Sequence, residues 1–405
     1  MKAGQQMNEG LLSGVRVVSF THFFVGAGAA QYLADLGAEV IKVEPVGRGA
    51  WERSWSPGGT MFGDTSLLLM MGSRNTKSIA VDLKSDEGRA VALDLVKSAD
   101  IVIQNYRPGI LAKFGLDYAS VSHLNPALVY GSASGYGLNS PFADLPGQDY
   151  LLQAEAGMLW MSQRAGSIAH YGAPIVDMHT ATLLAFGVTA ALVRSRQTGI
   201  GEHVEVEMLR AALELQAEPL SVYLNGGRYE HRSVPLTASY TVAPGGVYPT
   251  SDGHIALSQS PLADVLAAME IEIDLSDLGD LADEFGDAFD AREQIYSRIA
   301  PHFLGRTSEE WIGMLRAKRI WCAQVTSYEH IAEHPPVSAL DPFITVDVEG
   351  GSGVRLVGHP ISYGGRTPAP ESVAPALGEH TSQILAGIGY SADRIEQLYK
   401  SGAVA

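Results

Sequence analysis

Asp177 is the residue whose surroundings point most directly to chemistry. It follows the apolar residues 173–176 and precedes a long apolar stretch, 178–193, in which His179 is the only ionisable residue. The pattern predicts a strand end, a carboxylate and a buried helix. A helix N-terminus offers unpaired N–H donors and the positive end of a dipole, so we expect Asp177 to stay ionised, as a carboxylate nucleophile must. The same position also suits a simple N-cap, because aspartate is a favoured cap.

The composition is that of a globular chain with a large core. The length of 405 residues is enough for two or three domains. The residues are 46% hydrophobic and 18% charged, as in a globular protein. The formal net charge of -17 argues against general binding to nucleic acid or anionic membranes, although a few local Lys and Arg could hold a small anionic ligand. The single cysteine, Cys322, excludes an intrachain disulfide and a cysteine-based metal cage.

Two further stretches bear on localisation. Residues 1–10 are polar and lack the apolar core of a signal peptide, so we expect a cytoplasmic protein. The apolar stretch 178–193 has 16 residues and contains His and Thr. A membrane span needs about 20 apolar residues. This stretch is therefore predicted to be a core helix, and no membrane partner is expected.

Alternating strands and helices are predicted over the first 200 residues. Strand patterns occur at residues 15–20, 39–44, 78–83, 101–103 and 128–132, and helical patterns at 29–36 and 87–98. A strand, helix, strand order implies parallel pairing. The sequence thus predicts an α/β fold with a Rossmann-like open parallel sheet and helices on both faces.

The composition changes after about residue 210. A helix is predicted over 210–224, and the Asp252-Gly253 turn leads into a strand. Residues 270–293 hold ten acidic residues and one basic residue, which is typical of a solvated face. A loose segment at 349–369 precedes a final helix at about 392–400.

Several common kinds of site are poorly supported. Gly26 and Gly28 resemble part of a dinucleotide fingerprint, but the third glycine is missing and the first comes too late after the strand. His170 and His179 have no usual metal-ligand spacing, so no metal site is predicted. A Ser-His-Asp hydrolase lacks its Gly-x-Ser-x-Gly elbow, and the segment around Ser132 is interpreted as a glycine-rich strand end.

Basic residues are scarce in this chain, and several follow strands. Ligands of open α/β sheets bind beyond the carboxyl ends of the strands, so such positives suggest a phosphate-bearing ligand. Each taken singly is also compatible with an ordinary surface charge. The residues are Lys42, Arg48, Arg53, Arg74, Lys77, Arg107 and Lys113.

Taken together, these segments resemble the family III CoA-transferases, of the formyl-CoA and carnitine (CaiB/BaiF) type. The resemblance covers nearly the whole chain, and the order and spacing of its motifs are more specific than any one of them. The motifs are Leu-Ser-Gly-Val-Arg-Val-Val-Ser-Phe at 12–20, Leu-Gly-Ala-Glu-Val-Ile-Lys-Val-Glu at 36–44, Lys-Ser-Ile-Ala-Val-Asp-Leu-Lys at 77–84, Asn-Tyr-Arg-Pro-Gly at 105–109, Gly-Gln-Asp at 147–149 with Gln-Ala at 153–154, Gln-Thr-Gly-Ile-Gly-Glu at 197–202 and Leu-Gly-Glu-His-Thr at 377–381.

The resemblance implies that Asp177 is the catalytic nucleophile, because the family's aspartate precedes the long apolar helix that ends in a Thr-Gly-x-Gly turn. It would attack an acyl-CoA thioester to give an aspartyl-acyl anhydride and then an aspartyl-CoA thioester. A second carboxylic acid then takes the CoA, with no ATP or metal. Nearby backbone N–H groups would stabilise the oxyanions. CoA and acyl-CoA are thus substrates, and no permanent cofactor is expected.

The resemblance also implies a set of CoA-lining positions. Two departures bear on it: Pro45 stands where the formyl-CoA type has an arginine against adenine, and Thr76 replaces a commonly basic residue. The glycine loop of the formyl-CoA type has no clear counterpart. The implied positions are His22, Phe23, Phe24 and Val25 along the thiol channel, with Val81, Lys84, Asn105, Tyr106, Arg107, Lys113, Gly147, Gln148 and Asp149 elsewhere.

Two alternatives stay open. The α-methylacyl-CoA racemases resemble the transferases in fold but carry a histidine immediately before the aspartate that corresponds to Asp149. Here that residue is Gln148, which cannot exchange a proton at an α-carbon. The other alternative is a catalytically silent CoA-binding protein, which an intact Asp177 disfavours.

The resemblance finally implies an architecture. A large CoA-binding α/β domain would combine residues 1–205 and 335–405, and a small α+β domain would be inserted at 206–334. Two chains would interlock as a homodimer. The expected partners are an acyl-CoA donor and a small carboxylic acid.

Overall fold

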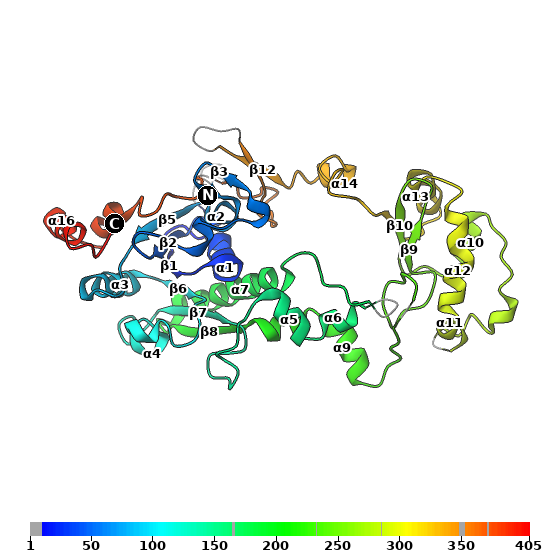
Figure 1. The fold of residues 1–405 in the computed structure, drawn as a ribbon, viewed down its shortest axis with the longest axis horizontal. Coiled ribbons are helices and arrows are strands. Elements are labelled where there is room, and N and C mark those ends of the chain that lie inside the picture. Colours follow the sequence, from blue (N-terminus) through cyan, green and yellow to red (C-terminus); the bar gives the residue numbers. More distant parts are fainter. Residues whose placement is uncertain (1–9, 164–166, 232, 285, 348–352, 371) are drawn as a thin grey trace. The chain divides into compact units, whose positions relative to one another are not determined.

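A computed structural model describes residues 10–163, 167–231, 233–284, 286–347, 353–370 and 372–405. These residues form two compact units (Figure 1). Unit 1 comprises the described residues of Met1–Leu152, Ala173–Leu215 and Pro342–Ala405, and unit 2 those of Gln153–Gly172 and Gln216–Asp341.

The units differ from the predicted domains in three segments, one of which is residues 335–341, predicted for the large domain but part of unit 2. Residues 206–215 stay with unit 1, because helix α8 (Met208–Glu214) follows directly on strand β8 (Glu202–Glu207). Residues 153–172 belong to unit 2, where the side chain of Gln216 donates a hydrogen bond of 2.9 Å to the carbonyl of Ala156. The boundaries after Leu152 and Leu215 have no adjacent glycine or proline, whereas Gly172 and Pro174 flank the boundary between them.

Unit 1 is built on a six-stranded sheet in which all pairings are parallel. From β1 the chain adds strands toward one edge of the sheet, and from β6 it adds strands toward the other edge. The direction in which strands are added therefore reverses between β1 and β6. Ligands of such sheets bind at this position, beyond the carboxyl ends. The strand order is β5 (Thr76–Ala80), β2 (Glu39–Glu44), β1 (Arg16–Phe20), β6 (Ile101–Gln104), β7 (Val129–Ser134) and β8.

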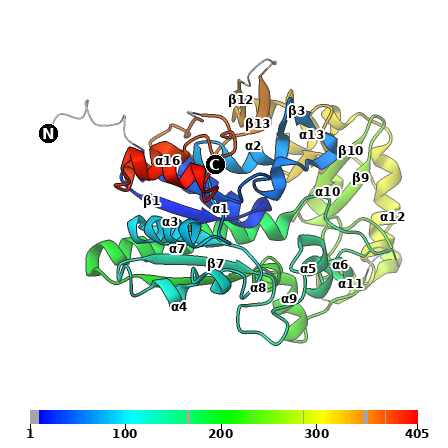
Figure 2. The same ribbon diagram turned by 60° about the vertical axis from the view of Figure 1, so that its left-hand side comes forward.

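Helices cover both faces of this sheet, as predicted (Figures 1 and 2). Helices α1 (Phe23–Asp35) and α7 (Ile175–Thr198) pack together on one face. Gly131 of β7 has no room for a side chain there, because Val188 and Leu184 of α7 lie against it. The other face forms one core with α3 (Asp86–Ser98), α4 (Tyr118–Val121), α15 (Thr381–Gly387) and α16 (Ala392–Lys400).

Most differences from the predicted elements lie at their ends. Strand β5 ends before the predicted one, and Val81 continues as an isolated bridge to Val404. Helix α1 starts at Phe23, six residues before the predicted start, so residues 22–25, which the family resemblance places along the thiol channel, are the N-cap and first turn of a helix. The helix predicted over 210–224 is two helices, α8 and α9 (Ala217–Leu224).

The remaining elements of unit 1 are short. Helix α2 (Leu67–Ser73) packs against the hairpin of β12 (Phe343–Val346) and β13 (Val354–Val357) through Leu69 and Met70. Strands β3 (Met61–Phe62) and β4 (Thr65–Ser66) form a small hairpin before α2. Helix α5 (Asp149–Glu155) begins in unit 1.

Unit 2 is α+β. Its antiparallel sheet, in the order β11 (Cys322–Gln324), β10 (His254–Leu257) and β9 (Gly246–Pro249), shares one core with α10 (Leu262–Met269), α12 (Arg292–Phe303) and α13 (Ser308–Ala317). Most of the described acidic side chains between residues 270 and 293 are exposed, as the charge run predicted. The other helices are α6 (Met158–Met161), α11 (Asp287–Asp290) and α14 (Pro335–Ser338).

Candidate active site

Asp177 is the third residue of α7, not its N-cap. The cap position is Pro174, and no strand precedes the helix. The carboxylate of Asp149, at the start of α5, takes the capping role instead: its Oδ2 accepts hydrogen bonds from the N–H of Val176 at 2.7 Å and of Asp177 at 2.9 Å. The predicted cap and a residue predicted to line the CoA site therefore meet at one helix end.

The charge state of Asp177 also differs from the expected one. Burial, and then the nearby charge of Asp149, raise the pKa of Asp177 to about 7. The sequence predicted that the helix end keeps this carboxyl ionised, whereas a pKa of about 7 leaves it only partly ionised at neutral pH. The physical reason is that Asp149 already takes the N–H groups that would otherwise favour a charge on Asp177.

The other donors of this turn are engaged as well. The N–H of Ile175 donates to the carbonyl of Ala173 at 2.8 Å, and that of Met178 to the carbonyl of Pro174 at 3.1 Å. The first turn of α7 thus has no free N–H group for an oxyanion. Donors for that purpose must come from elsewhere.

A second group of predicted residues meets where β1 and β6 end. The side chain of Asn105 accepts from the N–H of His22 at 3.0 Å and donates to its carbonyl at 2.8 Å. The ring of Tyr106 lies edge-on to that of His22, with 5.1 Å between their centroids. Burial lowers the pKa of His22, although nearby Glu52 partly offsets this. These contacts fix the backbone at the switch point of the sheet.

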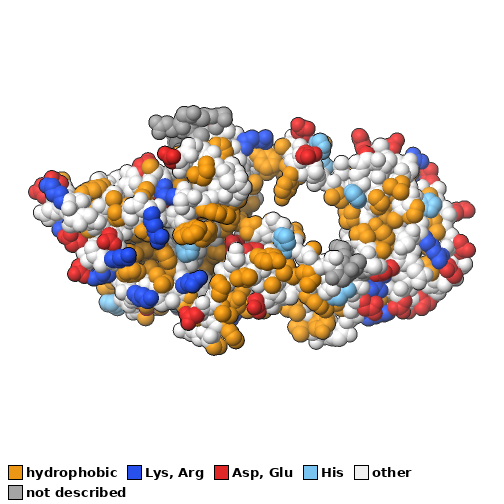
Figure 3. Space-filling view, in the orientation of Figure 1, with side chains coloured by type: hydrophobic (Ala, Val, Ile, Leu, Met, Phe, Trp, Pro, Cys, Tyr) orange, Lys and Arg blue, Asp and Glu red, His pale blue; other side chains and the backbone are white. Residues whose placement is uncertain are grey.

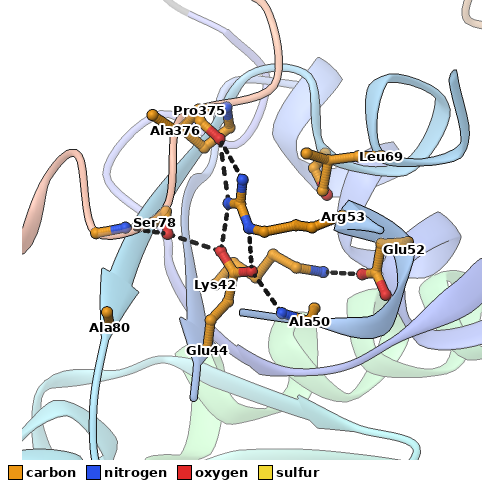
Figure 4. A network of polar contacts seen from close by, with 12 residues as sticks. Lys42, Glu44, Ala50, Glu52, Arg53, Leu69, Ser78, Ala80, Pro375 and Ala376 are labelled. Carbon is orange, nitrogen blue, oxygen red and sulfur yellow. Dashed lines mark hydrogen bonds and ion pairs between the residues drawn. The ribbon is translucent and has the colours of Figure 1, made fainter. Parts of the chain in front are cut away.

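The next residue, Phe23, has an unusual backbone. Its φ of 55° lies in the left-handed region, which is costly for a bulky side chain. The N–H of Phe23 donates a hydrogen bond of 3.3 Å to Oε2 of Glu52. The carboxylate of Glu52 also forms an ion pair of 2.6 Å with the buried Lys42 (Figure 4). Glu52 was not among the predicted site residues. A carboxylate eight residues beyond a strand gives no sign of this contact in the sequence.

Most of the predicted phosphate-binding cations are already paired. Arg53 makes two hydrogen bonds of 2.6 Å to the carboxylate of Glu44 (Figure 4). Arg74 pairs with Asp35 at 2.6 Å, and Lys77 with Glu39 at 2.7 Å. Among the residues that the structure describes, four basic side chains of the predicted sets lack such partners: Arg48, Lys84, Arg107 and Lys113.

A cavity of about 740 Å³ lies beyond the ends of β2, β5 and β6. Of the predicted CoA positions, Val81, Lys84 and Tyr106 line it, together with Pro45 and Arg48. Figure 3 shows Lys and Arg side chains around apolar ones on the displayed face of unit 1. The cavity therefore combines an apolar wall with exposed cations, which suits a ligand with a ring and phosphates.

The other predicted positions lie outside this cavity. Arg107 lines a second, smaller one, and Lys113 is exposed on the turn before Phe114. Gly147 lies backbone to backbone against Gly135, where a side chain would not fit. Gln148 precedes the capping Asp149. His22 to Val25 and Asn105 line neither of the two cavities.

The two glycines of the incomplete nucleotide fingerprint serve packing. A side chain on Gly26 would meet Thr21 and the side chain of Asn105, and one on Gly28 would come within 3.2 Å of Ala181 in α7. Their spacing reflects the close approach of α1 to its neighbours.

The comparisons with known proteins agree with this geometry. The model of CoA-transferase family III matches residues 12–381. The chain belongs to this family. It is 30% identical to a succinate–glutarate CoA-transferase of Agrobacterium fabrum, over 93% of this chain and 95% of that protein. It is 29% identical to an acyl-CoA transferase of Fusarium pseudograminearum, over 98% and 89%.

A solved structure supports the same conclusion. The structure of a mutant of Rv3272 from Mycobacterium tuberculosis has a TM-score of 0.81 and 27% identity, over 93% of this chain and 99% of that one. The protein is therefore a CoA-transferase built on the fold of its family.

Proposed function

We propose that this CoA-transferase moves CoA from an acyl-CoA to a small carboxylic acid through covalent intermediates on Asp177. The carboxylate attacks the thioester carbonyl, forming an anhydride and releasing CoA thiolate. The thiolate then attacks the aspartyl carbonyl and releases the donor acid. The acceptor acid repeats these two steps in reverse, which frees Asp177 and conserves the thioester bond.

The observation that carries this proposal is the setting of Asp177. It is a half-buried carboxylate with a raised pKa, beside a second carboxylate and at a helix end. A more basic carboxylate is a stronger nucleophile, and at neutral pH a large fraction of it is ionised. Strongly perturbed groups of this kind concentrate at functional sites.

The CoA itself is proposed to occupy the 740 Å³ cavity. Tyr106 and Pro45 offer an apolar wall for the adenine, and Arg48 and Lys84 are free to bind its phosphates. Arg48 lies three residues after Pro45, so it can supply the positive charge of the arginine that the formyl-CoA type has at the position of Pro45. Replacing Arg48 with alanine should raise the KM for acyl-CoA about tenfold or more and leave kcat nearly unchanged.

The test of the nucleophile is a pair of substitutions. Asp177→Asn and Asp177→Ala should lower CoA exchange by at least about 1,000-fold, because a covalent step loses its nucleophile. The substrates would be taken from a matrix of acyl-CoA esters and small acids, read by mass. Turnover within tenfold of the unchanged protein would contradict the proposal.

Transfer, not epimerisation, is proposed because Gln148 stands where a racemase needs a base. The protein is incubated with a 2-methylacyl-CoA in deuterated water and no acceptor acid. We expect no rapid uptake of deuterium at the α-carbon. Rapid uptake would favour the racemase alternative.

A homodimer is also proposed. Helix α7 is long and apolar enough to cross a membrane by length and composition, but it packs on α1 and the sheet. Its outer side still exposes Phe186 (72%) and Val193 (56%) in an apolar stripe that begins at Met178. A helix with apolar residues on all sides is normally buried. Phe186→Asp should therefore convert a dimer into a monomer in analytical ultracentrifugation.

A further inference from the structure

Three neighbouring strands carry polar side chains side by side near their carboxyl ends. Ser132 of β7 is in register with Gln104 of β6 on one side and with Glu205 of β8 on the other. Residues in register, and residues two apart, face the same side of a sheet. His203, two residues before Glu205, therefore shares this face, which is opposite to the one that α7 covers through Gly131.

These side chains form a chain of contacts. Ser132 Oγ lies 2.9 Å from Nε2 of His203, and Nδ1 of His203 lies 3.1 Å from Oε1 of Glu205. Glu205 is close enough for a charge interaction with the His203 ring, and a serine bonded to a histidine beside a carboxylate is the arrangement that activates a hydroxyl for acyl transfer. The residues around Ser132 do not predict this arrangement, because Ser132 lies within a strand and not on a nucleophile elbow.

Two aromatic rings hold the histidine ring in place. Tyr118 stacks on it, with 4.6 Å between centroids and 23° between planes, and Tyr130 lies edge-on at 5.6 Å. Burial lowers the pKa of His203, although Glu205 and Glu202 partly offset this. When the ring is neutral and carries its hydrogen on Nδ1, Nε2 can accept the proton of Ser132.

The serine faces a cavity of about 310 Å³. Ser132 is 1% exposed and lines this cavity together with Gln104, Tyr118 and Asn139. The side-chain oxygen of Gln104 accepts from the N–H of Tyr106, and its nitrogen has no partner among the described residues. That nitrogen is available to donate to an oxyanion beside Ser132. The volume is at the small end of the range for ligand sites.

We propose that Ser132, His203 and Glu205 form a second, hydrolytic site for short acyl esters, distinct from Asp177. Ser132 Oγ attacks the ester carbonyl while its proton passes to Nε2 of His203. The carbon–oxygen bond to the alcohol breaks, and the alcohol leaves with that proton. Water then attacks the acyl-serine, giving one proton to His203, and the acid leaves as Ser132 regains a proton.

The experiment combines a covalent probe with hydrolysis. The full chain carrying Asp177→Asn is treated with a fluorophosphonate and digested, and the adduct is located by mass. Hydrolysis of p-nitrophenyl acetate is measured in parallel. We expect the adduct on Ser132, and a fall in both labelling and hydrolysis of at least about 100-fold in Ser132→Ala and in His203→Gln.

Ser134→Ala is the matched control. Ser134 lies two residues further along β7, and its hydroxyl accepts from the N–H of Gly137 and does not line the cavity. It should label and hydrolyse as the parent does, and melting temperatures check that each variant folds. An adduct on another residue, no adduct, or hydrolysis within threefold of the parent in Ser132→Ala would overturn the proposal. If a variant does not fold, the position of the adduct in the parent decides.

Discussion

Two carboxylates of unit 1, the buried Glu44 and the half-buried Asp177, have pKa values that shift in opposite directions. Burial raises the pKa of Glu44, at the end of β2, but hydrogen bonds and charges from Arg53, the charge of Lys42 and the N–H of Ala50 lower it further, so the net shift is downward. Asp177 has no such cation, and its neighbour Asp149 adds a second negative charge. A compensated carboxylate holds structure together, whereas an uncompensated one is ready to react.

Figure 4 shows how complete the compensation of Glu44 is. Its oxygens accept from Arg53, from the hydroxyl of Ser78 at 2.7 Å and from the N–H of Ala50 at 3.0 Å. Arg53 in turn donates to the carbonyl of Pro375, which ties the loop after β2 to the C-terminal segment. The network therefore supports the edge of the proposed CoA cavity, which Glu44 also lines.

The largest effect is expected from breaking this network. Glu44→Gln should lower the free energy of unfolding by about 3–5 kcal/mol, because it leaves Arg53 buried without its counter-charge. Glu39→Gln is the control: Glu39 also pairs with two cations, but it is 33% exposed, so its loss should cost less than about 1 kcal/mol. Thermal and urea unfolding measure both. Equal losses would mean that burial does not distinguish the two sites.

The next effect is on the pH dependence of transfer. Asp177 reacts as a carboxylate, and its pKa is raised to about 7, so kcat/KM should rise about tenfold per pH unit below 7 and level off above it. Asp149→Asn removes a negative charge next to it and should move the midpoint to lower pH. A profile that is flat from pH 5 to 8, or a midpoint that moves upward, would count against this electrostatic account.

The smallest effect is expected on how stability changes with pH. The pKa of Asp177 is about 7 in the fold and about 3.9 in an unfolded chain, so the folded state binds more protons between these values. Stability therefore falls as the pH rises from 4 to 7. Asp177→Asn removes this cost and should stabilise the protein by about 1–2 kcal/mol at pH 8, with no gain at pH 4. Melting temperatures at the two pH values test this, and a loss of stability at pH 8 would show that the charge is compensated after all.

The sequence predicted the elements better than the contacts between them. Strands such as β1 and helix α16 follow from local patterns, and the predicted parallel sheet is confirmed. The helix end at Asp177 was misread, because its cap comes from Asp149, 28 residues earlier in the chain. A local pattern shows that a helix needs a cap, but not which distant side chain supplies it.

The same limit applies to charges. Lys42 lies within β2, and Arg53 and Arg74 lie outside the strands. All three were predicted to be candidates for phosphate binding, yet each is paired with a carboxylate. Both partners are visible in the sequence, but whether a cation is free depends on how the loops fold back. Ser132 and His203, 71 residues apart, meet only because β7 and β8 are neighbours.

The most direct test of the account is to trap the covalent intermediate. Acyl-CoA alone is added, the reaction is quenched, and the peptide that contains Asp177 is searched for a CoA-sized adduct or, after hydroxylamine, a hydroxamate. The measurement is repeated with a chelator and with Cys322→Ala. We predict an adduct on Asp177 that survives both treatments. Exchange with ternary-complex kinetics, no trapped adduct and dependence on a metal would contradict the account and leave Asp177 as a structural residue of the helix end.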